Sequence, residues 1–91
     1  MITTLKKRAL HRSKIIEGQM RGVQKMIDGE EYCMDIITQT LAIQKSLSSL
    51  NKLLLENHLR THVKQMFEQG EANKAIDELL LTYELGKVRG K

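Results

Sequence analysis

The chain has 91 residues, a single cysteine, no proline or tryptophan, and a net charge of +4 at pH 7. This length allows one small domain, which we assign to residues 1–91. No apolar run approaches the roughly 20 residues that span a membrane, and the N-terminal segment lacks the apolar core of a secretory signal. A lone cysteine cannot form an intrachain disulfide, so we expect a cytoplasmic protein with a reduced thiol and no membrane partner.

Strong helix formers dominate the composition, and two turn signals that contain glycine, at residues 28–30 and 69–71, divide the chain. The pattern predicts an all-α fold with three helices over about residues 4–27, 31–68 and 72–86. Gly70 fits the C-terminal end of the second helix and Gly86 that of the third.

The first predicted helix is strongly basic, because residues 1–25 carry seven basic side chains and only one acidic side chain. Such a segment indicates either a polyanion partner, such as nucleic acid, or simply a solvated helix face. His11 lies among these basic residues, so we interpret it as a surface or DNA-side residue. Apolar residues recur at helical spacing farther along the same helix, at Ile15, Ile16, Met20, Val23, Met26 and Ile27.

The second predicted helix is long, about 55 Å at a rise of roughly 1.5 Å per residue. One chain of this size cannot cover such a helix alone. We therefore infer that identical chains pair along it in an antiparallel four-helix-bundle dimer.

The stretch ENHLRTHV, residues 56–63, places His58 and His62 on one helix face. Two such histidines are either structural or two ligands of a metal site. Cys33 is the natural soft third ligand, yet 25 residues of helix separate it from His58, roughly 37 Å at the same rise. Two antiparallel chains could bring Cys33 of one chain beside the histidines of the other. One thiolate and two imidazoles favour Cu(I), whereas Zn(II), Ni(II) or Co(II) would need a further ligand.

Three segments of the chain resemble the CsoR/RcnR family of small helical bacterial repressors. These segments are RSKIIEGQMRGVQKMI at 12–27, EEYCMDIITQTLAIQKSL at 30–47 and ENHLRTHV at 56–63. The resemblance implies a disc-like homotetramer, a dimer of dimers, whose apo form binds operator DNA and represses metal efflux or resistance genes. It also implies that effector binding at the Cys33, His58 and His62 site releases the DNA.

Within this family the chain looks closest to the copper-sensing members, although His62 stands where many have a second cysteine. Nickel and cobalt sensors carry an extra N-terminal histidine, and formaldehyde sensors have proline at position 2, where this chain has Ile2. Persulfide sensors need a second cysteine. The alternative effectors of the same repressor are therefore Ni, Co, Zn or formaldehyde acting through Cys33.

The resemblance also implies roles for residues around the ligands and on the DNA side. Tyr32 and Glu78 match side chains that hydrogen-bond around the ligand histidine in copper-sensing relatives. Arg12, Lys14 and Lys52 match basic positions that contact DNA, while Ser49 departs from a further basic position. The cluster at residues 6–8 could compensate for that departure.

Two other classes of protein stay open at this point. A structural helical oligomer would keep its role without Cys33. An enzyme with a Cys–His pair is disfavoured, because no Asp or Asn that would orient the histidine, and no pocket-building loop, is evident in the sequence. No other protein partner is implied.

Overall fold

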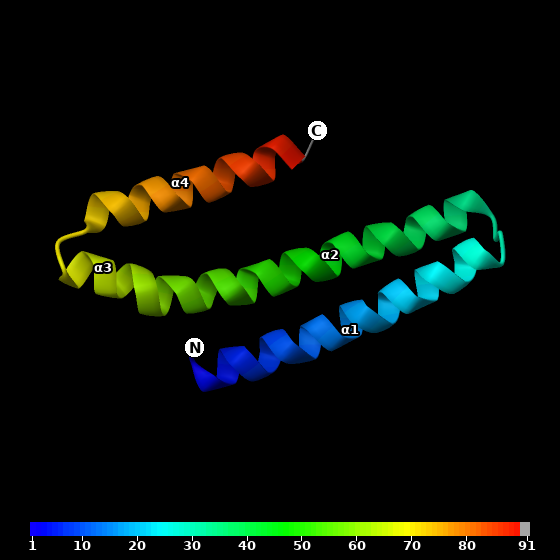
Figure 1. Cartoon of the computed structure of the whole chain (residues 1–91), viewed down its shortest axis with the longest axis horizontal. Coiled ribbons are helices and arrows are strands. Elements are labelled where there is room, and N and C mark those ends of the chain that lie inside the picture. The colour runs from blue at the N-terminus through cyan, green and yellow to red at the C-terminus, as the bar shows by residue number, and fades with distance from the viewer. Residues whose placement is uncertain (90–91) are drawn as a thin grey trace. The chain divides into compact units, whose positions relative to one another are not determined.

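The computed structural model describes residues 1–89, and nearly all of them are helical (Figure 1). Helix α1 spans Thr3–Asp28 and α2 spans Cys33–His58. A π-helical turn, η1 (Leu59–Val63), continues directly into α3 (Lys64–Glu68), and α4 spans Ala72–Arg89. Helical residues thus run without a break from 33 to 68. The prediction of an all-α chain with three helical segments and a long central one is confirmed.

The chain divides into two compact units, Met1–Asn57 and His58–Lys91. In the first unit α1 and α2 lie side by side and run in opposite directions (Figure 1). Their contact buries Leu5, Ala9 and Val23 of α1 and Ile43, Ser46 and Asn57 of α2. Leu5 and Ala9 extend the core to the basic end of α1, beyond the apolar stripe that the sequence predicted.

A buried polar contact fixes the beginning of α1. The amide of Ile2 donates a hydrogen bond to Oδ1 of Asn57, at 2.9 Å, and the Asn57 side chain is only 4% exposed. Ile2 is the N-cap residue of α1 and supplies no side-chain cap. Asn57 therefore ties the first turn of α1 to the C-terminal end of α2.

The turn between α1 and α2 places a glutamate, rather than a glycine, in the left-handed region. Glu30 has φ +50°, whereas Gly29 has φ −80°. The amides of Glu31 and Glu30 donate to the carbonyl oxygens of Met26 and Ile27, both at 3.0 Å, which is the Schellman pattern of a helix C-terminus. The sequence predicted this turn but not which residue would take the positive φ.

The second unit has a similar helix end with glycine in that position. Gly70 has φ +77°, and the amide of Glu71 donates to the carbonyl oxygen of Met66 at 2.7 Å. The predicted end of the second helix at Gly70 is confirmed. Helix α4 then returns along α3 (Figure 1), with Ala75 completely buried and Val63 of η1 buried as well.

The predicted end of the third helix at Gly86 is wrong, because α4 continues to Arg89. A glycine inside a helix costs roughly 1 kcal/mol relative to alanine, which neighbouring turns can offset. The apolar residues of α4 are only partly covered: Ala75 is buried, whereas Ile76, Leu80 and Tyr83 are 45–66% exposed. Among the described helices, none is long and apolar enough to cross a membrane.

Candidate metal centre and nucleic-acid interface

The two histidines of the ENHLRTHV stretch lie close together in the second unit. His58 is the last residue of α2, and His62 lies in the π-helical turn that follows. Their ring centroids are 5.2 Å apart, with the ring planes tilted by 35°. The spacing of four residues thus brings two imidazoles to one place, as the sequence predicted. π-Helical turns are rare and often occur at functional sites.

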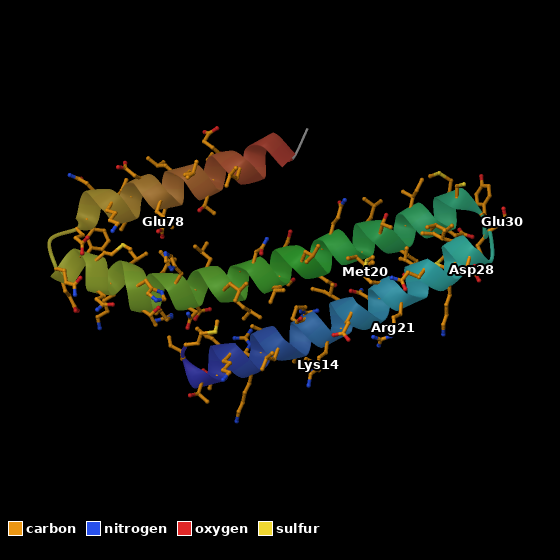
Figure 2. All side chains as sticks on the ribbon, viewed as in Figure 1. Lys14, Met20, Arg21, Asp28, Glu30 and Glu78 are labelled. Carbon is orange, nitrogen blue, oxygen red and sulfur yellow. The ribbon has the colours of Figure 1, made fainter. Side chains whose placement is uncertain are left out.

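Contacts to neighbouring side chains distinguish the two nitrogens of each ring. Nε2 of His58 contacts Oε1 of Glu78, which projects from α4 (Figure 2). Nδ1 of His62 lies 3.3 Å from Oγ1 of Thr61. These contacts engage Nε2 of His58 and Nδ1 of His62. The second nitrogen of each ring is Nδ1 in His58 and Nε2 in His62.

Glu78 is the carboxylate that the family resemblance implied beside a ligand histidine. The two side chains come from positions 20 residues apart and are about one-third (His58) and nearly one-half (Glu78) exposed. A carboxylate that accepts from one ring nitrogen fixes the tautomer and the orientation of the imidazole, and it makes the other nitrogen a better ligand.

Cys33 and Tyr32 lie in the first unit, where α2 begins. Cys33 is the first residue of that helix and its thiol is free and exposed. The carbonyl oxygen of Tyr32 accepts hydrogen bonds from the amides of Asp35 and Ile36, at 3.0 and 3.2 Å, and the Tyr32 side chain is 71% exposed. The local fold thus leaves both side chains accessible.

Across residues 1–89 of one chain, no three or more Cys, His, Asp or Glu side chains are grouped so that they could hold a metal ion. The joint site of Cys33, His58 and His62 therefore stays a prediction. The donor set itself, a thiol and two imidazoles, fits a soft or borderline metal.

Basic residues of α1 and α2 meet in a groove of the first unit. Two adjoining pockets share Arg8, Arg12 and Leu53. One is completed by Lys7 and His11, and the other by Ser49, Lys52 and Glu56. We call this feature the basic groove, and we define it by Lys7, Arg8, His11, Arg12, Ser49, Lys52, Leu53 and Glu56.

The basic groove brings together two of the three residues predicted to contact DNA, Arg12 and Lys52. The third, Lys14, is exposed on α1 and does not line the groove (Figure 2). Arg8 is the groove residue that sequence reasoning had treated only as part of a compensating cluster. Its four-residue spacing from Arg12, which places both on one helix face, is the signal that could have identified it.

Comparison with known proteins defines the class to which this fold and these sites belong. The family model described as "Metal-sensitive transcriptional repressor" matches residues 5–84. The chain belongs to this family of metal-sensitive transcriptional repressors, which confirms the resemblance seen in the sequence. The family's description names a regulator and not an enzyme.

Several copper-sensing repressors are similar to the chain. It is 35% identical over 79 residues to the copper-sensing transcriptional repressor CsoR of Mycobacterium tuberculosis (strain ATCC 25618 / H37Rv), covering 87% of this chain and 66% of that protein. It is 40% identical over 70 residues to CsoR of Bacillus subtilis (strain 168), covering 77% of this chain and 69% of that protein. The chain thus spans just under two thirds of the mycobacterial relative's length.

A solved structure shares the fold. The crystal structure of the copper-sensing repressor CsoR with Cu(I) from Geobacillus thermodenitrificans NG80-2 superposes with a TM-score of 0.81 at 36% identity. The superposition covers 89% of this chain and 84% of that chain.

Proposed function

We propose that the protein is a copper-responsive repressor that acts in the cytoplasm as a homotetramer, a dimer of dimers. Its apo form binds operator DNA, and Cu(I) bound between subunits releases the DNA and derepresses metal efflux or resistance genes. The observation that carries this proposal is the pair of adjacent imidazoles of His58 and His62, with Glu78 against one of them. The similarity to copper-sensing repressors supports copper as the metal.

The protein ligands would come from two subunits. Helix α2 begins at Cys33 and ends at His58, so its own length, roughly 37 Å at 1.5 Å per residue, separates these two ligands. An antiparallel partner would bring its Cys33 to the histidine pair. His58 would offer Nδ1 and His62 would offer Nε2, because neighbouring side chains engage the opposite nitrogens.

An uncovered apolar stripe on α2 supports a second copy as the partner. Met34, Ile37 and Leu41 recur at helical spacing on one face near the start of α2 and are 46–55% exposed in the single chain, and Leu55, which is 43% exposed, lies on the same side nearer the end of the helix. A contiguous exposed apolar patch typically marks an interaction surface. Pairing along this face would cover the stripe and join the ligands in one step.

The chain's own residues also suggest how metal binding would be transmitted. Bound Cu(I) would link the thiolate of Cys33 in one subunit to the imidazoles of the other. Glu78 holds His58 and belongs to α4, so any change in the position of that ring would be passed directly to α4. Tyr32 precedes Cys33 and would respond at the other end of the site. For a switch, the metal must bind the DNA-free form more tightly, by roughly 1–3 kcal/mol in typical allosteric proteins.

The basic groove and Lys14 would provide the DNA-binding surface. Arg12 and Lys52 come from different helices, and both line the groove. Neither helix carries a recognition motif, so we expect contacts to phosphates to dominate and the affinity to fall steeply with salt.

The test is DNA release, measured by fluorescence anisotropy under anaerobic conditions with a labelled fragment of the protein's own promoter region. Cu(I), Zn(II), Ni(II), Co(II) and formaldehyde are titrated separately into wild-type protein and Cys33→Ala. We expect release at about one Cu(I) per chain, and no release from Cys33→Ala, which should still bind DNA.

The other outcomes are informative. Release of the DNA by a different effector would support the repressor function and contradict copper as the effector. Failure of the apo-protein to bind DNA at low salt would contradict the repressor proposal, and full copper response by Cys33→Ala would contradict the proposed site.

A further inference from the structure

The basic groove contains one histidine among its permanently charged side chains. His11 is exposed on α1 and lines the same pocket as Lys7, Arg8 and Arg12. Histidine is the side chain that ordinarily gains or loses a proton between pH 5 and 8. Neither the metal site nor the family resemblance assigns a role to this histidine among permanent cations.

The arrangement of the groove residues favours phosphate groups as the ligand. Lys7, Arg8, His11 and Arg12 are spaced so that they share one face of α1, and Ser49, Lys52, Leu53 and Glu56 share one face of α2. The two pockets measure about 280 and 300 Å³, at the lower limit of small-molecule sites, which typically measure about 300–1,000 Å³. The cationic lining of the two pockets, rather than their volume, favours phosphate as the ligand.

We propose that His11 is a proton-dependent phosphate contact of the basic groove, and that the two adjoining pockets hold successive phosphates of one DNA strand. This inference rests on the proposed function, since it deepens the DNA contact. Protonated imidazole donates from both ring nitrogens and adds a positive charge, whereas neutral imidazole donates from one and adds none.

The charges near His11 and on the bound phosphate determine whether DNA affinity rises or falls with pH. The charged groups that line the groove with His11 are Lys7, Arg8 and Arg12 on α1 and Lys52 and Glu56 on α2. A bound phosphate adds negative charge and favours the protonated imidazole. DNA binding is therefore coupled to proton uptake at His11, so DNA affinity is higher at low pH and falls as the pH rises.

The experiment measures apo-protein affinity for the promoter fragment at pH 6.0, 7.0 and 8.0 and constant ionic strength. Wild-type protein, His11→Gln and His11→Lys are compared. We expect wild-type affinity to fall roughly three- to tenfold more than that of His11→Gln between pH 6.0 and 8.0, as for the loss of one phosphate contact. His11→Lys should keep high affinity at pH 8.0, because its charge does not depend on pH in this range.

Equal pH dependence of wild-type protein and His11→Gln would overturn the inference while leaving the proposed function intact. Absence of DNA binding by all three proteins would instead overturn both. An additional series replaces DNA by inorganic phosphate at the same ionic strength. A pH-dependent shift of the His11 ring signals in NMR spectra on addition of DNA, but not of inorganic phosphate, identifies the DNA backbone as the source. The reverse result contradicts the proposal.

Discussion

Glu78 is the residue whose position most directly affects the candidate metal site. Its carboxylate holds Nε2 of His58 from a different helix, and such partners typically change metal affinity by roughly 10- to 100-fold when they are lost. We predict that Glu78→Gln weakens Cu(I) binding by about that range. It should also reduce the effect of Cu(I) on DNA affinity, because the tautomer of His58 is then less firmly fixed.

A competition titration with a Cu(I) chelator measures the affinity of this variant. Glu84→Gln, which removes an exposed carboxylate from the same helix, is the matched control. Equal affinities of the two variants would show that Glu78 does not orient the ligand.

Asn57 acts at the same scale, at the beginning of α1. Its buried Oδ1 accepts from the amide of Ile2, and its loss leaves that donor without its partner. We predict that Asn57→Ala lowers the free energy of unfolding by about 1–2 kcal/mol. It should also speed hydrogen exchange in the first turn of α1 and weaken DNA binding, since residues 6–8 belong to that end of the helix.

Asn51→Ala, which changes an exposed asparagine of the same helix, is the control for this variant. Urea unfolding and amide exchange measure the two effects. Unchanged exchange at the start of α1 would argue against the anchoring role.

At the scale of the helices, the turn between α1 and α2 carries a local strain. Glu30 adopts φ +50°, a conformation that costs a residue with a Cβ atom roughly 1 kcal/mol and costs glycine little. We predict that Glu30→Gly raises the free energy of unfolding by at most about 1 kcal/mol, because the greater freedom of glycine in the unfolded chain offsets part of the relieved strain; the melting temperature should rise by at most about 4–8 °C.

The neighbouring substitution Glu31→Gly should not stabilise the protein, because Glu31 has no positive φ. Thermal unfolding is compared at one fixed protein concentration, since an oligomer's melting temperature depends on concentration. Equal shifts of the melting temperature for Glu30→Gly and Glu31→Gly would contradict the explanation that the positive φ of Glu30 strains the turn.

The helix boundaries illustrate what local sequence can and cannot predict. Gly70 was predicted as a helix end and is one, because it occupies the left-handed position that completes the Schellman pattern. Gly86 was also predicted as a helix end, yet α4 passes through it. Both glycines look alike in the sequence. Only Gly70 adopts the left-handed conformation that ends a helix, whereas the residues after Gly86 continue α4.

At the scale of the whole molecule, our proposal that the apolar stripe on α2 pairs with a second chain can be tested directly. We predict that Leu41→Glu, which places a charge in the centre of this stripe, shifts the protein to monomers. Burying an unpaired charge in an apolar interface costs several kcal/mol. Light scattering coupled to gel filtration measures the change.

Ala42→Glu is the control, because Ala42 is exposed on the same helix but points away from the stripe. The monomeric variant should also lose tight Cu(I) binding, since Cys33 would no longer reach the histidines. A Leu41→Glu protein that remains oligomeric would exclude this face as the interface.

The sequence by itself determined the features that arise from neighbours along the chain. Helical periodicity, the two turns and the four-residue spacing of His58 and His62 are local, so the residue order alone was sufficient to predict them. The ordered match of three segments to a known family extended this prediction to the fold class and the type of regulator. The roles of all the predicted site residues remain predictions, namely the metal ligands Cys33, His58 and His62, the neighbouring Tyr32 and Glu78, and the DNA contacts Arg12, Lys14 and Lys52.

The tertiary structure decided the contacts between residues far apart in the sequence. It paired Glu78 with His58, tied Ile2 to Asn57 across 55 positions, and joined Arg8 and Arg12 of α1 to Lys52 of α2 in one groove. No local pattern predicts such contacts, because each depends on how the helices rotate and pack against each other. That packing follows from the burial of Leu5, Ala9, Val23 and Ile43 in one unit and of Val63 and Ala75 in the other.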